Sequence, residues 1–478
     1  MFYEKMKVPP PTWCPECRRQ RRASWRNERT LYKRKCNASR HNEDIISVFS
    51  LDKPITVYDD RFWWSDQWDA LTYGKGYSFS RPFFKQFREL LEKVPLINLS
   101  ITNMVNCSYC NVSADDKGCY LISASEANEQ VMYSNRVGWN KDSLDIYIGD
   151  RNELCYEIVN CNQCYSLFFS RNCSQCRESV FLYDCINCSN CFGCTNLRNK
   201  SYCIFNEPHS KGNYQKMIKK FDFGSFRKIN ENRDRFNKFL LESIHRFAFI
   251  IRSVNTTGDN VVGAKNCLFC FDALAGPSGI SAEDCKYVTW GGFNCKDAYD
   301  VGPGFGAFVE QVYDSFDSGL KSNRLYFTSV VYGSHDVYYS INCHGSNNLF
   351  GCYGLRSKSY CILNKQYTKE EYEKLVPKII DQMNSMPYVD KKGRIYKYGE
   401  FFPPELSPFC YNETVAQEYF PLTKEQAIEQ GYKWKDPEPR NYQITIKAKD
   451  LPDHIKDCLL YTSPSPRDRT RSRMPSSA

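Results

Sequence analysis

The sequence lacks any long apolar run. No stretch approaches the roughly 18 consecutive apolar residues that a membrane helix needs, so we expect no membrane span. Residues 1–5 (MFYEK) also lack the apolar core of a signal peptide. We therefore expect a cytoplasmic protein in which most of the 25 cysteines stay reduced, as core thiols or as zinc ligands.

Catalytic signatures are missing as well. The chain contains no G-x-S-x-G, Walker, H-E-x-x-H or Rossmann motif, and its six histidines are scattered. Acid chemistry could still use the cluster Asp297, Asp300, Asp314 and Asp317, although Asp is also a common turn residue. We expect a non-enzymatic protein, and the alternative is a carbohydrate-active β-helix lyase or hydrolase.

The sequence does contain an internal duplication. Residues 192–206 (FGCTNLRNKSYCIFN) recur as residues 350–364 (FGCYGLRSKSYCILN), with eleven of fifteen positions identical at an offset of 158. Internal repeats of this kind are the signature of a repeat architecture.

Short apolar bursts centred on an aromatic residue extend the repeat on both sides of this block. They occur at Tyr120, Tyr133, Tyr147, Tyr156, Phe168, Phe181, Phe192 and Tyr202, and again at Tyr287, Tyr299, Tyr313, Tyr326, Tyr338, Phe350 and Tyr360. The spacing clusters near twelve residues, which leaves no room for helical crossovers. An antiparallel meander is possible, but the regular duplication favours a parallel β-helix with roughly two such strands per turn.

The predicted fold is therefore mainly β: a duplicated parallel β-helix (solenoid) with helical caps and a helical insert, preceded by a small zinc-knuckle segment. Its divisions are a zinc-knuckle and basic segment (1–60), an aromatic linker and helix (61–105), a first solenoid half (106–209), a helical insert (210–252), a second solenoid half (253–366), a helix and extended C-terminal region (367–457), and a tail (458–478).

Most cysteines fall inside the repeats. Cys155, Cys164, Cys173, Cys185, Cys194 and Cys203 are nine or twelve residues apart, and several others form C-x-x-C pairs. Zinc sites are one interpretation. We favour stacks of small buried thiols, because these pairs lack the flanking Gly and basic residues of zinc knuckles. The Asn residues before many of the pairs, such as Asn160 and Asn172, are expected to form side-chain ladders.

The N-terminal region contains a different pair, in the sequence Cys14-Pro15-Glu16-Cys17. This C-x-x-C spacing is typical of half a zinc ribbon, and tetrahedral zinc needs two more ligands. Cys36 lies at a suitable distance, but Ser39 occupies the position of its expected partner. We predict a site formed by Cys14, Cys17, Cys36 and His41. The alternatives are a pair upstream of the first residue, or two thiols without metal.

A basic segment follows the knuckle. Its cations are Arg18, Arg19, Arg21, Arg22, Arg26, Arg29, Lys33, Arg34 and Lys35, opposed only by Glu28. Trp25 and Tyr32 are interleaved with them. Such charge suits a phosphate backbone, and aromatic rings can stack on bases, so RNA or DNA is the predicted partner. A solvated surface or the docking face for an acidic protein partner is the alternative.

Several motifs resemble those of a known but uncharacterised family. They are Pro9-Pro10-Pro11, Cys14-Pro15-Glu16-Cys17-Arg18, Trp63-Trp64-Ser65-Asp66, Asn190-Cys191-Phe192-Gly193-Cys194 and Leu451-Pro452-Asp453-His454-Ile455-Lys456. The sequence resembles a cysteine-rich zinc-ribbon and β-helix family of candidate-phylum bacteria, whose members are often labelled zinc-binding or CaiB/BaiF-type CoA-transferases. We find no residues that support the transferase label.

The resemblance implies zinc-ribbon halves beyond both ends of this chain, a second cysteine after Cys36 and a cysteine pair near Tyr58. Ser39 and Asp59-Asp60-Arg61 stand at those internal positions, which argues against a second N-terminal zinc site. The resemblance brings no established activity with it.

The tail from Cys458 onward resembles translated sequencing-adapter read-through, and we exclude it from the fold. It carries four Arg and one Asp, so the net charge falls from +9 to +6 without it. The resulting hypothesis is a zinc-binding scaffold or adaptor that binds nucleic acid or a ribonucleoprotein through residues 18–35.

Overall fold

The structure is a computed structural model. It describes residues 2–457 except 40, 274–281, 288–290, 294–304, 308, 310–311, 438–446 and 448–449. The chain divides into two compact units: unit 1 is Met1–Ile101 with Arg246–Lys435, and unit 2 is Thr102–His245 with Asp436–Ala478. The N-terminal segment therefore belongs to the same unit as the second solenoid half. Among the described residues, no helix has the length and apolar character needed to cross a membrane.

Unit 2 contains the first solenoid half and the helical insert. Its elements are β6 (Asn111–Ala114), β7 (Ser123–Glu126), β8 (Glu129–Met132), β9 (Asn135–Gly138), β10 (Lys141–Asp150), β11 (Tyr156–Asn162), β12 (Tyr165–Arg171), β13 (Arg177–Val180), β14 (Cys203–Ile204), β15 (Glu207–Pro208), α5 (Lys211–Ile218) and α6 (Phe226–Leu241), with β5 (Ile101–Thr102) at the junction.

Unit 1 contains the second half and both flanking regions. Its helices are α1 (Phe2–Lys5), α2 (Pro15–Ala23), α3 (Asp60–Trp64), α4 (Phe83–Leu91), α7 (Lys369–Ser385), α8 (Val415–Tyr419) and α9 (Lys424–Glu429). Its strands are β1 (Tyr32–Lys35), β2 (Asp44–Ser47), β3 (Val57–Tyr58), β4 (Leu96–Ile97), β16 (Ile250–Ile251), β17 (Gly258–Val262), β18 (Cys270–Ala273), β19 (Gly291–Phe293), β20 (Phe305–Ala307), β21 (Val312–Tyr313), β22 (Phe316–Ser318), β23 (Asn323–Tyr326), β24 (Ser329–Val331), β25 (His335–Tyr338), β26 (Asn347–Phe350), β27 (Ser359–Ile362), β28 (Lys365–Gln366), β29 (Tyr388–Val389) and β30 (Ile395–Tyr396).

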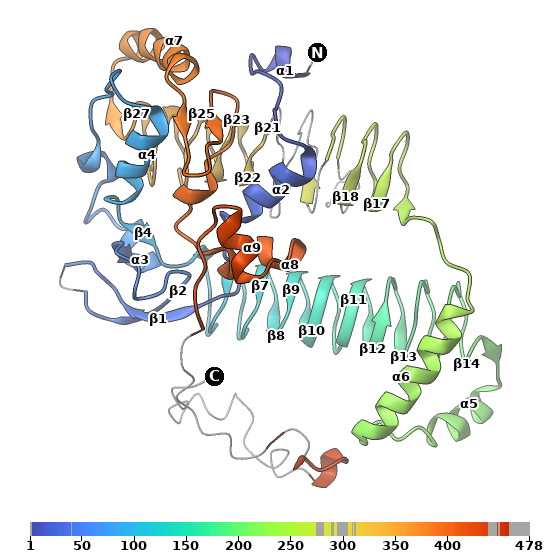
Figure 1. The fold of residues 1–478 in the computed structure, drawn as a ribbon. Coiled ribbons are helices and arrows are strands. Elements are labelled where there is room, and N and C mark those ends of the chain that lie inside the picture. Colours follow the sequence, from blue (N-terminus) through green and yellow to red (C-terminus); the bar gives the residue numbers. More distant parts are fainter. Residues whose placement is uncertain are drawn as a thin grey trace. The chain divides into compact units, whose positions relative to one another are not determined.

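The predicted parallel β-solenoid is confirmed, with about 19 turns. Strands pair in parallel at a register of twelve residues, as in Leu144↔Tyr156 between β10 and β11 and Val337↔Leu349 between β25 and β26. Figure 1 shows these short strands stacked in succession within each half. Because a residue lies directly above the one twelve positions earlier, twelve residues complete one turn. The expectation of two such strands per turn is therefore wrong.

The backbone turns a corner at every third residue. From Asn103 to Phe205, each third position has a positive φ, close to +50° or slightly above. Four corners divide each turn into three-residue sides. Non-glycine residues adopt this left-handed conformation at a cost of roughly 1–2 kcal/mol each. Hydrogen bonds to both neighbouring turns offset this cost: Tyr120 N donates to Val131 O (3.1 Å), and Tyr133 N donates to Tyr120 O (3.0 Å).

The triplet pattern sends one residue per side into a narrow interior. These inward positions hold small and aliphatic residues, and the cysteines of the first half share them; Cys155, Cys161, Cys164, Cys173, Cys176, Cys185, Cys188, Cys191, Cys194 and Cys203 form one buried cluster with residues such as Leu167. Their thiols donate to main-chain carbonyls, as from Cys176 Sγ to Cys185 O (3.4 Å). Their placement is that of core thiols.

Asparagine ladders follow the same twelve-residue spacing. Asn160 donates to Asn172 at 2.9 Å, at an outer corner, as expected from the sequence. A second ladder, which the sequence analysis did not identify, is buried: Asn140 donates to Asn128 (3.1 Å), and Asn152 donates to Asn140 (2.9 Å). These amides satisfy polar groups that the narrow interior would otherwise leave without partners.

The two halves end in the same way, which confirms the duplication. Cys203 pairs with Pro208 and Cys361 pairs with Gln366, each in an antiparallel hairpin that ends the stack. Both cysteines are buried. A helix follows each hairpin. Tyr202 contacts Tyr214 of α5 with ring centroids 5.7 Å apart, and Tyr360 contacts Tyr372 of α7 at 5.8 Å.

Helix caps agree with the sequence pattern. Ser225 caps α6 through its hydroxyl, which accepts from Lys228 N at 3.1 Å, and Thr368 forms a capping box with Glu371 at the start of α7. A proline inside a helix normally kinks or shortens it, but α7 continues through Pro377 to Ser385.

The twelve-residue turn makes a direct prediction about deletions in unit 2. Removing residues 141–152 takes out one whole turn and keeps every inward position inward. We expect this variant to retain its strand content and to unfold cooperatively, as judged by circular dichroism and limited proteolysis. Removing only residues 141–150 shifts the triplet phase and turns core side chains outward, so this smaller deletion should prevent folding. Equal behaviour of the two variants would contradict the triplet rule.

Candidate metal site

Three potential metal ligands meet in unit 1. Cys36 follows β1, His41 lies beyond the next turn, and Asp59 follows β3 as the N-cap of α3. Their ligand atoms all lie within 4.8 Å of one another. Cys36 and Asp59 are 5% and 6% exposed, while His41 is half-buried. The group is therefore mostly shielded from water.

The contacts within the group leave the ligand atoms facing one another. Cys36 Sγ accepts from the backbone N–H groups of Ala38 and Asp59, both at 3.4 Å. Asp59 Oδ1 accepts from Phe62 N at 2.9 Å. Asp59 Oδ2 lies 2.7 Å from His41 Nδ1, yet this buried nitrogen has no partner with hydrogen-bond geometry. The sulfur, the imidazole and one carboxylate oxygen are thus positioned as ligands around a common point.

The wall around the group is apolar. Cys36 clusters with Ala38 and Phe62, and Tyr58 and Trp68 pack against them. Burial, followed by the neighbouring Tyr73 and Cys36, raises the pKa of Tyr58 to about 12, so this phenol stays protonated. Thiolate, imidazole and carboxylate are all zinc ligands, and a dry, low-dielectric wall strengthens their attraction for a cation. The residues therefore fit zinc, with the fourth position left to water or to another ligand.

Only two of the four zinc ligands predicted from the sequence lie in this group. Cys36 and His41 belong to this group, and Cys14 and Cys17 do not. The ligand missed by sequence analysis is Asp59. The sequence did point to this position. The resemblance implies a cysteine pair near Tyr58, and a carboxylate, which can also bind zinc, stands there instead.

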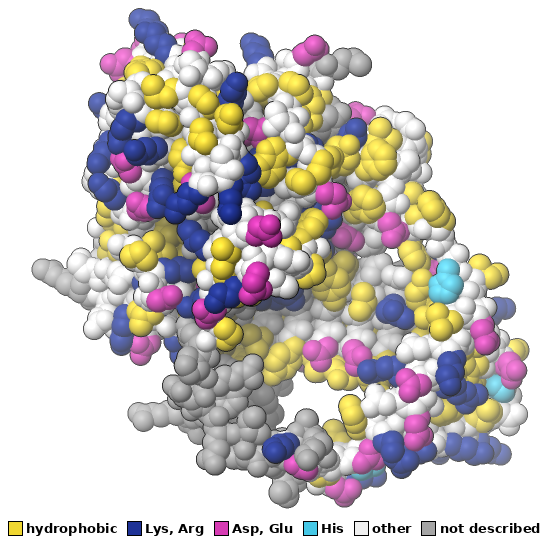
Figure 2. Space-filling view, in the orientation of Figure 1, with side chains coloured by type: hydrophobic (Ala, Val, Ile, Leu, Met, Phe, Trp, Pro, Cys, Tyr) yellow, Lys and Arg dark blue, Asp and Glu magenta, His cyan; other side chains and the backbone are white. Residues whose placement is uncertain are grey.

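The basic segment is not the exposed patch that its charge predicts. Five of its cations are buried: Arg18, Arg21, Arg22, Arg26 and Arg34. Trp25 is also buried, and its ring lies 5.1 Å from that of Phe402. Figure 2 shows basic and acidic side chains interspersed over the visible face. Phosphates cannot reach the buried guanidinium groups, nor bases the indole, without unfolding this region.

Acidic residues far along the chain neutralise these arginines. Arg21 lies 2.8 Å from both Asp314 and Glu400, and Arg22 also pairs with Asp314. Arg26 pairs with Asp317 at 2.6 Å. Burial by itself would lower the pKa of Arg21, but Asp314 and Glu400 outweigh it and raise that pKa above its ordinary value. The Arg21 guanidinium therefore keeps its charge, and its ion pairs are internal.

The other cations of the segment have contacts of their own. Arg19 lies 5.0 Å from the Tyr419 ring centroid, Arg29 pairs with Glu418, and Lys35 lies 2.8 Å from Asp44. Lys33 is exposed. The segment therefore presents less free positive charge than its composition predicts.

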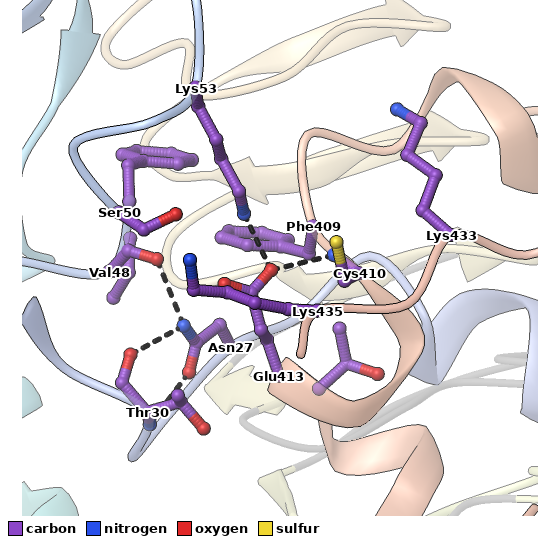
Figure 3. A network of polar contacts seen from close by, with 12 residues as sticks. Asn27, Thr30, Val48, Ser50, Lys53, Phe409, Cys410, Glu413, Lys433 and Lys435 are labelled. Atoms are coloured by element: carbon purple, nitrogen blue, oxygen red, sulfur yellow. Dashed lines mark hydrogen bonds and ion pairs between the residues drawn. The ribbon is translucent and has the colours of Figure 1, made fainter. Parts of the chain in front are cut away.

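Figure 3 shows how the residues after α2 are held to the C-terminal region of unit 1. Asn27 donates to Val48 O at 3.0 Å and accepts from Thr30 N at 2.9 Å. Lys53 lies 2.5 Å from Glu413, which also accepts from Cys410 N at 2.7 Å. This network continues the anchoring that begins with Arg21.

The structure describes two of the four acidic residues considered for carbohydrate chemistry. Asp314 and Asp317 are buried partners of the arginines. Asp297 and Asp300 lie outside the described residues.

A scan against protein-family models found no match for this chain, and a search of curated proteins found none either.

The arginine network predicts a large loss of stability on neutralisation. Arg21→Gln would remove the cation that pairs with both Asp314 and Glu400 and would leave Asp314 with Arg22 alone, and we expect it to lower the free energy of unfolding by roughly 3–5 kcal/mol in denaturant titrations. The matched control is Arg29→Gln, because the Arg29–Glu418 pair is largely exposed. Its effect should stay within about 1 kcal/mol. Similar losses in both variants would contradict the structural role of the buried network.

Proposed function

We propose that this chain is a non-enzymatic, zinc-binding β-solenoid scaffold, with the zinc ion held by Cys36, His41 and Asp59. The observation that supports this best is the convergence of these three ligand atoms within 4.8 Å, with His41 Nδ1 2.7 Å from Asp59 Oδ2 but not in hydrogen-bond geometry. A sulfur and a nitrogen ligand beside one carboxylate favour zinc over magnesium or calcium, which prefer oxygen ligands alone.

The proposed role of the ion is structural. It would link the turn after β1 to the start of α3, two segments that also meet through the Asp59 N–H to Cys36 Sγ hydrogen bond and the packing of Phe62 on Cys36. Short peripheral segments of this kind gain stability from metal binding, because the ion binds the folded form alone. The solenoid itself supplies long stacked faces, and such faces commonly serve as binding surfaces.

The proposed function does not include nucleic-acid binding. Strong phosphate binding needs many accessible cations, and five of the nine cations are buried, with Arg21, Arg22 and Arg26 in ion pairs. An enzymatic role through Asp314 and Asp317 is disfavoured for the same reason.

Metal analysis of the purified, reduced chain tests the proposal. We expect about one zinc per chain, loss of that zinc in Cys36→Ser and in Asp59→Ala, and a lower melting temperature after chelation. The matched control is Cys410→Ser, a half-buried cysteine outside the ligand group, which should retain the metal.

Two results would contradict the assignment. One is wild-type protein without zinc after purification in zinc-containing buffer. The other is full zinc retention in Cys36→Ser, which would place the ion elsewhere. The double variant Cys14→Ser/Cys17→Ser should keep its zinc, because neither thiol belongs to the ligand group.

A further inference from the structure

Cys14 and Cys17 differ from every other described cysteine in their exposure. Both are exposed, whereas the remaining described cysteines are buried or half-buried. Cys14 is the N-cap of α2, and its sulfur accepts the backbone N–H of Cys17 at 3.3 Å. The two thiols therefore share the first turn of one helix and face solvent.

The geometry suits a disulfide within the pair. Cys14 is the N-cap and Cys17 lies in the first turn, and the Cys17 N–H reaches Cys14 Sγ at 3.3 Å. A C-x-x-C pair with low thiol pKa at a helix N-terminus is the arrangement of disulfide oxidoreductases. Among the residues that the structure describes, no third metal ligand joins this pair. Two thiols suffice for a disulfide, whereas a tetrahedral zinc site needs four ligands.

The two thiols are electrostatically unequal. The hydrogen bond from the Cys17 side chain, followed by backbone N–H groups and the charge of Arg18, lowers the pKa of Cys14. The same side-chain hydrogen bond, followed by burial, raises the pKa of Cys17. The N-terminal end of the helix dipole also favours a thiolate at Cys14. This asymmetry matches a nucleophilic thiol beside a resolving thiol.

Contacts to one buried carboxylate, Glu400, anchor the chain on both sides of the pair. Before it, Thr12 donates to Glu400 Oε1 from its backbone N (3.2 Å) and its hydroxyl (2.6 Å). After it, Arg21 donates to Glu400 Oε2 at 2.8 Å. One buried carboxylate thus anchors the chain on both sides of the dithiol and holds the start of α2 in place.

We propose that Cys14 and Cys17 form a thiol–disulfide exchange site whose co-substrates are organic disulfides. The Cys14 thiolate attacks one sulfur of the disulfide, which forms a mixed disulfide and releases one thiolate. Cys17 then loses its proton and attacks Cys14 Sγ, which forms the Cys14–Cys17 disulfide and releases the second thiolate. The protein dithiol is oxidised by two electrons, and the organic disulfide is reduced to two thiols.

This site is separate from the metal site, so its failure would leave the zinc proposal intact. The test uses the full chain, metal-free and reduced, with glutathione disulfide as the probe. Mass spectrometry after alkylation should show one new disulfide, between Cys14 and Cys17, with the buried thiols unchanged. Alkylation of Cys14 should proceed with a midpoint below the pH typical of an ordinary thiol.

Single variants separate the two roles. Cys17→Ser should accumulate glutathione on Cys14, because the resolving thiol is gone. Cys14→Ser keeps a good N-cap, so the helix is retained, but its reaction with glutathione disulfide should slow at least about tenfold. Cys410→Ser serves as the control and should react like the wild type.

Three outcomes would overturn the proposal. The wild-type pair could remain reduced at equilibrium with glutathione disulfide. Cys17→Ser could form no mixed disulfide on Cys14. Protein prepared with zinc could carry an ion at this pair that blocks alkylation until a chelator is added, which would make the pair a metal half-site instead.

Discussion

The hydrogen bonding between successive twelve-residue turns is the constraint on which the solenoid depends. Its corners require a left-handed backbone at every third residue, filled mostly by residues other than glycine. A single turn could not sustain this strain, because each corner is unfavourable by itself. Stacking supplies donors and acceptors on both sides of every turn, so the strain is tolerated only in a continuous array.

The narrow interior explains the abundance of cysteine. Each turn admits one side chain from each of four short sides, and the backbone leaves room only for small or slender groups. A thiol is a small hydrophobe that can still donate a weak hydrogen bond to a carbonyl, so it fills this space without leaving a polar group unpaired. Outside the stack, Cys36 lies beside His41, and Cys14 lies beside Cys17.

Three of the N-terminal arginines form buried ion pairs instead of a charged surface. Arg21, Arg22 and Arg26 meet Asp314, Asp317 and Glu400 within unit 1. Burying a guanidinium is unfavourable unless a carboxylate and good hydrogen-bond geometry accompany it, so these pairs tolerate few alternative arrangements. They hold α2 against the second solenoid half, and with it the exposed dithiol at the start of that helix.

The sequence by itself determined the repeat, its twelve-residue period, the duplication and the helix caps at Ser225 and Thr368, because these depend on residues close together in the chain. It also identified Cys36 and His41 as neighbours. Only the tertiary structure decided that twelve residues make one whole turn, that Asp59 lies beside Cys36 and His41, and that Cys14 and Cys17 stand apart from this group. It alone paired Arg21 with Asp314, 293 positions away. Local patterns record spacing and polarity, whereas the partner of a charge is set by which distant segments pack together.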